Sequence, residues 1–276
     1  MFTENQLVQF DTFGFVVMRG ILTSDELSTI NAEFDVGLAR ARAAMARRGI
    51  RKQLNWSNLG PGTPFLASLL EDSRFLEPAE QLYGEDVVGY YANANSFDSD
   101  RTEWHPDTTN LVRRGVKFAF YLQPLDEQTG ALRFISGSHK APLHSDIKKI
   151  TLKESSDGLI DAVGLDIDEM PAYVARSQPG DVIAFDNRVW HASWGGGCDR
   201  RMCSVGYFAA PATPEPATPE EEASMAEMVE QEARLVEAFP LVKLPPHWIA
   251  NPDHSPHRQR WLGVLRDWGF IGTDGS

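Results

Sequence analysis

The sequence Trp-His-Pro-Asp at residues 104–107 places a histidine and an aspartate two positions apart. In an extended segment such side chains point to the same side, so His105 and Asp107 can reach one point. A second histidine, His191, lies far downstream and must come from another strand. Two imidazoles and one carboxylate that leave other coordination positions open are typical of non-heme Fe(II) sites. These three residues are therefore predicted to bind a metal ion.

The segments that carry these residues predict an antiparallel β core. Between residues 86 and 210 the chain is a series of short β-rich runs separated by Gly, Asp, Asn and Pro, a texture typical of a sandwich or jelly roll. No long helical pattern alternates with the runs, which argues against a doubly wound parallel sheet. The residues therefore predict a mainly β fold with flanking helices, with a sandwich and a jelly roll both open.

Helical patterns flank this core on both sides. In residues 1–85, Thr3 and Thr23 each begin a capping box and so predict two helix starts. Residues 211–276 begin with a Pro-rich linker and continue as helices whose aromatic residues should pack on the core. The whole chain, residues 1–276, is predicted to form a single domain.

The composition limits the kind of partner. The 276 residues include 26 Lys and Arg against 39 Asp and Glu, a formal net charge of −13. Such an acidic surface repels nucleic acid and anionic membranes, so a small molecule is the expected partner. The chain has no apolar run of about 20 residues, no signal-like amino terminus and only two cysteines. A cytoplasmic protein is expected, with monomer and homodimer both left open.

Longer motifs carry a family resemblance. The His-x-Asp motif is followed by TGALRFISGSHK at residues 129–140 and QPGDVIAFDNRVWHAS at 178–193. On these motifs the chain resembles the phytanoyl-CoA dioxygenase family of Fe(II)- and 2-oxoglutarate-dependent oxygenases. The resemblance covers most of the chain. It implies that the fold class, mainly β with flanking helices, is a double-stranded β-helix, the cupin-like jelly roll, and that His105, Asp107 and His191 are the iron ligands.

The resemblance also implies a site for the cosubstrate 2-oxoglutarate. In the family, an arginine ten or eleven residues beyond the distal histidine binds the far carboxylate. That position falls on Arg201, with the adjacent Arg200 as the less favoured choice. A planar guanidinium can hold a carboxylate through two parallel hydrogen bonds. Ser193, two residues beyond His191, is expected to donate to the same carboxylate.

Further polar residues on predicted strands are weaker candidates. Asn93 and Asn95 share a strand face and could hydrogen-bond cosubstrate or substrate, although structural amides explain them at least as well. Two interpretations of Lys117 are open: it helps Arg201 to bind the cosubstrate, or its side chain snorkels to the rim of the barrel. The family often places tryptophan at the position of Ala119, so this wall of the pocket is expected to differ.

The resemblance implies an enzyme that uses Fe(II), 2-oxoglutarate and O₂ to oxidise a C–H bond of a small metabolite or natural-product intermediate. Succinate and CO₂ are released. Hydroxylation is the leading reaction, with desaturation and other oxidations open. Asp107 argues against halogenation, because related halogenases have Ala or Gly there. Two alternatives remain from the residues themselves: a cupin-like isomerase or hydrolase that does not use 2-oxoglutarate, and a non-catalytic binding module.

Overall fold

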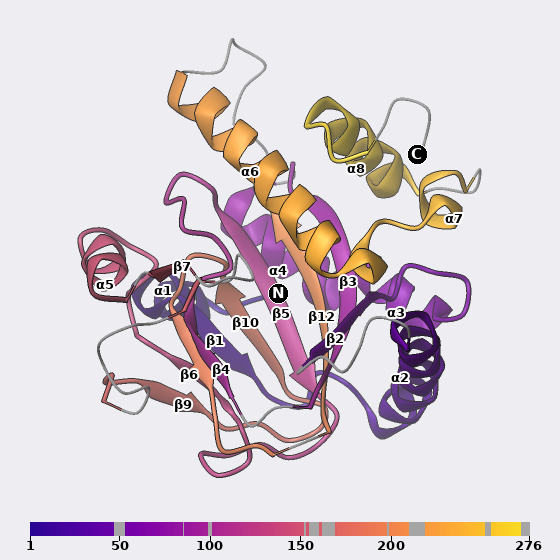
Figure 1. Cartoon of the computed structure of the whole chain (residues 1–276), viewed down its shortest axis with the longest axis horizontal. Helices are drawn as coiled ribbons and strands as arrows, with labels where there is room; N and C mark the ends of the chain where they lie inside the picture. Colours follow the sequence, from indigo (N-terminus) through magenta and orange to yellow (C-terminus); the bar gives the residue numbers. More distant parts are fainter. Residues whose placement is uncertain are drawn as a thin grey trace.

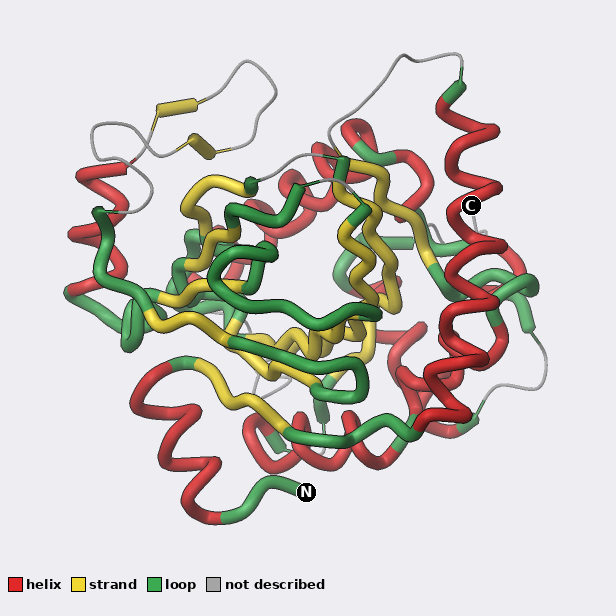
Figure 2. Tube along the Cα trace, turned by 90° about the horizontal axis from the view of Figure 1, so that it is seen from below, coloured by secondary structure: helices red, strands yellow, loops and turns green. Residues whose placement is uncertain are grey.

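The structure, a computed structural model, forms a β core with helices around it (Figures 1 and 2). It describes the following parts of the chain: residues 1–46, 53–84, 86–98, 101–151, 153–154, 160–161, 169–197, 199–209, 219–251 and 255–271. Cys198 and residues 211–218, most of the Pro-rich linker predicted at 211–220, lie outside these residues. No helix in the described ranges is long and apolar enough to cross a membrane.

Two antiparallel sheets face each other and form the jelly roll. The larger sheet has the strand order β1 (Phe15–Met18), β10 (Val182–Asp186), β5 (Gly115–Tyr121), β12 (Arg200–Phe208), β3 (Val88–Phe97) and β2 (Gln53–Ser57). The smaller has the order β4 (Thr102–His105), β11 (His191–Ser193), β6 (Leu132–Phe134) and β9 (Tyr173–Ala175). A separate pair joins β7 (Lys153–Glu154) and β8 (Ile160–Asp161). The predicted fold class is confirmed. Two strands of the larger sheet, β1 and β2, come from residues 1–85.

The two faces of the larger sheet are covered differently. On β12, Cys203, Val205 and Tyr207 belong to the core beneath the helices, whereas Met202 belongs to the core between the sheets. Because successive side chains of a strand point to opposite faces, even-numbered residues from 200 to 206 face the interior of the jelly roll. This alternation decides which side chains can reach the site.

Helices cover the outer face of the larger sheet. They are α1 (Glu4–Phe13), α2 (Ser24–Met45), α3 (Pro64–Ser68), η1 (Leu69–Glu71) and α4 (Ser73–Tyr83), while α5 (Leu143–Thr151) follows β6. Both predicted capping boxes are present: the Thr3 hydroxyl accepts from the amide of Gln6, and that of Thr23 accepts from Glu26. Phe34 of α2 and Phe75 of α4 are fully buried in the helix-side core.

The carboxyl-terminal extension consists of α6 (Pro219–Ala238), η2 (Pro240–Val242), α7 (Pro246–Ile249) and α8 (Pro256–Asp267). Trp261 of α8 is fully buried, and its indole N–H donates to the carbonyl of Val87 at 2.9 Å. The same ring lies against Gly89, where a Cβ would come within 2.8 Å of it. The prediction that this tail packs on the core is confirmed.

Candidate metal centre

The three predicted ligands lie together. His105 on β4 and His191 on β11 are direct partners across the two strands, and their ring centroids are 4.4 Å apart. Asp107 follows two residues after His105. One ligand atom from each of the three residues lies within 4.8 Å of the other two. The two-residue spacing and the strand pairing therefore bring together two nitrogens and one carboxylate oxygen.

Backbone carbonyls orient both imidazoles. Nδ1 of His105 lies 2.7 Å from the carbonyl of Glu103, and Nδ1 of His191 lies 3.0 Å from that of Val189. A carbonyl oxygen only accepts, so each Nδ1 carries the proton and donates it. Nε2 of each ring is then unprotonated and available to a metal, which is how ligating histidines are usually held. The residues present therefore fit a divalent metal ion.

The local environment keeps these groups in the charge states that metal binding needs. Burial lowers the pKa of His105 and, together with the charge of His105, lowers that of His191 to about 3, so both rings stay neutral. Burial on its own would raise the pKa of Asp107, but the charge of Lys117, together with the two adjacent imidazoles, outweighs burial and lowers this pKa below its ordinary value. A neutral imidazole pair with an ionised carboxylate is a ligand set suited to Fe(II).

Lys117 lies at the metal end of the site. Its Nζ donates to Oδ2 of Asp107 at 2.7 Å, and it lies 5.5 Å from the centroid of the Phe185 ring. Neither interpretation of Lys117 from the sequence included this contact with Asp107. The register explains it: Lys117 is opposite Gly206 on β12, well along the strand from Arg200 and Arg201.

The structure contradicts the expectation that Arg201 joins the site. Its guanidinium donates to Asn31 at 3.0 Å, pairs with Asp35 and lies 4.3 Å from the Phe34 ring centroid, all on α2. Arg201 has the same strand parity as the helix-facing residues of β12, so its side chain cannot point between the sheets.

Arg200 occupies the interior position instead. It is 1% exposed, donates to the Ser193 hydroxyl and to the carbonyl of Gly130, each at 2.8 Å, and lies 4.7 Å from the Phe97 ring centroid. Ser193 is 3% exposed and follows His191 by two residues on β11. The structure thus brings the predicted serine together with the less favoured arginine.

The two predicted asparagines face the same interior space. In the pairing of β3 with β12, Asn93 lies opposite Ser204 and Asn95 opposite Met202. Asn55 on β2 lies opposite Asn95 and shares this face, although no sequence pattern singled it out. The Asn93 amide oxygen is buried without a hydrogen-bond partner among the described residues. The expectation that Asn93 and Asn95 share a face is confirmed, whereas their role stays a prediction.

A model of the phytanoyl-CoA dioxygenase (PhyH) family matches residues 10–202. This span is more than half of the chain and contains all three members of the triad. The chain belongs to the phytanoyl-CoA dioxygenase family. The prediction of a dioxygenase of the 2-oxoglutarate-dependent class is confirmed by this membership.

The chain is also similar to a curated relative and to solved structures. The ectoine dioxygenase of Bordetella bronchiseptica is 22% identical over 214 residues, which cover 69% of this chain and 70% of that protein. EvdO2 from Micromonospora carbonacea var. aurantiaca, solved with 2-oxoglutarate, is 16% identical at a TM-score of 0.58, covering 80% of this chain and 96% of that chain. HygX from Streptomyces hygroscopicus, solved with nickel and 2-oxoglutarate, is 18% identical at a TM-score of 0.57. The match covers 78% of this chain and 90% of the HygX chain. At these identities the solved structures support the fold.

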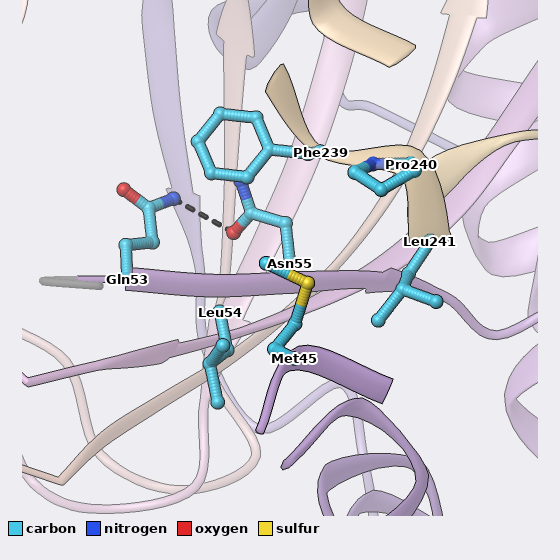
Figure 3. A pocket seen from close by; sticks show the side chains of 7 residues that line it. All are labelled: Met45, Gln53, Leu54, Asn55, Phe239, Pro240 and Leu241. Carbon is cyan, nitrogen blue, oxygen red and sulfur yellow. Dashed lines mark hydrogen bonds between the residues drawn. The ribbon is translucent and has the colours of Figure 1, made fainter. Parts of the chain in front are cut away.

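Two hollows lie among residues outside the triad. The smaller, about 10 Å³, lies where the segment after α6 packs against β2 (Figure 3). There Phe239 stands near Asn55, whose side-chain oxygen accepts from Gln53 at 2.8 Å. The second, about 280 Å³, is lined by residues of the α3 region together with His247, Trp248 and Arg258. Neither contains a triad residue, so neither defines the chemistry of the site.

Proposed function

We propose that this protein is an Fe(II)- and 2-oxoglutarate-dependent oxygenase that oxidises a C–H bond of a small polar metabolite or biosynthetic intermediate, with hydroxylation as the leading reaction. The observation that carries the proposal is the triad of His105, Asp107 and His191 in a chain of this family. The cupin-like isomerase or hydrolase and the binding module receive no support from these matches. A cytoplasmic location and a monomeric or homodimeric state stay predictions.

The triad would hold the iron through Nε2 of each histidine and one oxygen of Asp107. When bound, iron supplies the redox chemistry that lets dioxygen oxidise an unactivated C–H bond, with conversion of 2-oxoglutarate to succinate and CO₂. The role of the protein is to fix the ligands and to control water in the site. The donation from Lys117 to Oδ2 holds the Asp107 carboxylate in place and leaves its other oxygen as the metal ligand.

Arg200 and Ser193 would bind the far carboxylate of 2-oxoglutarate. Arg200 is a permanently charged group inside the jelly roll, where an anion without a partner would be costly. Ser193 already accepts a hydrogen bond from Arg200, so its own hydroxyl proton remains available for an incoming carboxylate. Arg200 would take the role that the resemblance implied for Arg201.

The relatives suggest which compounds to test first. Two solved neighbours contain 2-oxoglutarate, one of them with nickel, which supports that cosubstrate here. Three relatives are ectoine dioxygenases at 22% identity. We therefore place ectoine first in a substrate screen, without assigning it as the substrate.

Anaerobic addition of Fe(II) and 2-oxoglutarate tests the proposal. The wild-type protein should develop the weak visible metal-to-ligand charge-transfer band of the bound chelate. His191→Ala should lose this band and bind Co(II) at least roughly tenfold more weakly by calorimetry. His257→Ala, which changes a histidine in α8, should behave as wild type. A folded protein that binds metal but never forms the band would support the isomerase or hydrolase alternative, and no metal uptake would support the binding module.

A further inference from the structure

Helix α6 is attached to the loop that carries the metal motif. Gln231 donates to the backbone carbonyl of Asp107 at 2.9 Å and accepts from Arg113 at 3.1 Å. One turn earlier, Glu227 accepts from Asn110 at 2.9 Å. Figure 1 shows α6 crossing in front of the larger sheet beside this loop. A segment more than 100 residues downstream of the metal motif therefore forms a wall next to it.

The inward stripe of α6 contains a carboxylate. Ser224 and Met228 are buried, and Glu232 follows at the same four-residue spacing with its side chain partly buried. No hydrogen bond or ion pair to the Glu232 carboxylate occurs among the described residues, and the charge of Arg113 acts on it only from a distance. Burial raises the pKa of Glu232, and Arg113 opposes that rise. The Arg113 guanidinium lies instead 4.4 Å from the centroid of the Phe208 ring.

Aromatic rings connect Arg113, which contacts α6 through Gln231, with the metal end of the site. The pairing of β3 with β12 shifts register at Gly206, and this bulge leaves Tyr90 without an opposite residue. Tyr90 stacks on Phe208 at 4.3 Å and meets the adjacent Tyr91 edge to face at 4.5 Å. Tyr91 lies over Gly206, with its ring centroid 6.0 Å from Nζ of Lys117.

The charge of Glu232 acts on both tyrosines. Burial raises the pKa of Tyr90, and the nearby charges of Glu232 and Asp107 raise it further, with Arg113 opposing them. Burial, Tyr90, Asp107 and Glu232 all raise the pKa of Tyr91. The two tyrosines therefore lie within the field of both the metal-binding carboxylate and the α6 carboxylate.

We propose that Glu232 is a substrate-binding residue and that the substrate carries a cationic nitrogen, which Glu232 binds beside the faces of Tyr90 and Tyr91. A partly desolvated carboxylate attracts a cation more strongly than an exposed one does, and aromatic faces add cation–π attraction. An ammonium or amidinium group also supplies the hydrogen-bond donors that a carboxylate lacks. This inference rests on the proposed function, since it concerns the substrate of the same centre.

The test uses three probes of similar size and different charge. The anaerobic protein with Fe(II) and 2-oxoglutarate is titrated with butylammonium, 1-butanol or butanoate, and the change in the charge-transfer band gives an apparent Kd for each. Wild type should bind butylammonium at least about tenfold more tightly than butanol, a difference of roughly 1.4 kcal/mol, and butanoate most weakly.

Two variants of α6 separate the carboxylate from the helix. Glu232→Gln should reduce the preference for butylammonium to less than about threefold, since an amide of the same shape has no charge. Glu230→Gln alters an exposed glutamate that pairs with Arg234 on the outer side of the same helix, and it should keep the wild-type preference. Retention of the 2-oxoglutarate band shows that each variant is folded and loaded.

Several results would overturn the inference: equal binding of butylammonium and butanol by wild type, an unchanged preference in Glu232→Gln, or a band that none of the three probes alters. Failure of the proposed function is distinguishable from these, because then the band with 2-oxoglutarate would not form before any probe is added.

Discussion

The Arg200 guanidinium donates to the Ser193 hydroxyl at 2.8 Å inside the jelly roll, two residues along β11 from the metal-site histidine His191. The neighbouring Arg201 points through the opposite face of the same strand to α2. The single strand β12 thus places the Arg200 cation in the interior and the Arg201 cation against the helices. The chemistry of the site therefore depends on which of the two arginines faces the interior.

Arg200→Gln should weaken 2-oxoglutarate binding by more than about tenfold, because the variant leaves the far carboxylate without a charged, bidentate partner. Arg201→Gln should leave the affinity within about twofold of wild type, since that side chain contacts Asn31 and Asp35 on α2. The measurement is a titration of the Fe(II)-loaded protein with 2-oxoglutarate, followed by the charge-transfer band.

Arg200 is buried, so loss of binding could reflect loss of folding. Arg200→Lys serves as a second variant, because it keeps the charge and loses the planar fork. It should give an intermediate affinity while Co(II) binding to the triad stays at the wild-type value. Equal weakening by Arg200→Gln and Arg201→Gln, with metal binding intact, would contradict the assignment.

Local signals in the sequence predicted the metal site because they needed only short-range geometry. The His-x-Asp spacing places His105 and Asp107 on one side of an extended segment, and the capping boxes at Thr3 and Thr23 depend on residues three positions apart. His191 was added through the family resemblance of the motif around it, since no local spacing connects it with His105 and Asp107.

The choice between the two arginines could not be made by counting from His191. The turn between β11 and β12 contains left-handed residues, with φ of +84° at Gly195, +59° at Gly197 and 65° at Asp199. Such a turn sets the register of the next strand, and a slip of one residue exchanges the two faces. The alternation within β12 does decide the choice, because Cys203, Val205 and Tyr207 face the helices and Arg201 has the same parity. No local sequence pattern predicted the contact between α6 and the metal loop, because Gln231 and Asp107 are 124 residues apart.

Gly206→Ala should destabilise the protein by about 1–3 kcal/mol, the usual cost of an added methyl group in a packed interior. A Cβ at this position would lie 2.1 Å from Cε1 and 2.2 Å from Cζ of Tyr91, so the ring would have to move. Urea unfolding of wild type, Gly206→Ala, Tyr91→Ala and the double variant measures the coupling between the two positions.

In the Tyr91→Ala background, Gly206→Ala should cost less than about 0.5 kcal/mol, because the clashing ring is gone. Gly263→Ala on α8 is the matched control, since a Cβ added there would meet nothing within 4 Å. Alanine in a helix interior should stabilise by up to about 1 kcal/mol relative to glycine. A cost for Gly206→Ala that persists without the Tyr91 ring would show that the glycine is needed for another reason.

The ion pair between Glu26 and Arg74 should make stability depend on pH in a defined window. Glu26 accepts from Arg74 at 2.6 Å, and this hydrogen bond is the main reason that its pKa falls from 4.5 to about 2. A carboxylate with a lowered folded-state pKa stabilises the protein above its unfolded pKa, and the contribution is lost as the pH falls. The difference between wild type and Glu26→Gln should therefore be full above about pH 5 and should shrink as the pH falls from 4.5 towards 2.

The size and the origin of this pH dependence can be separated by the choice of variants. Glutamine can still close the capping box with Thr23, so Glu26→Gln isolates the charge. Because the pair is partly exposed, the full difference should be about 1 kcal/mol or less, measured by urea unfolding at several pH values. Asp25→Asn, which alters an acidic residue in the same first turn, is the matched control for the charge at the helix terminus. An equal dependence would assign the effect to the helix terminus and not to the ion pair with Arg74.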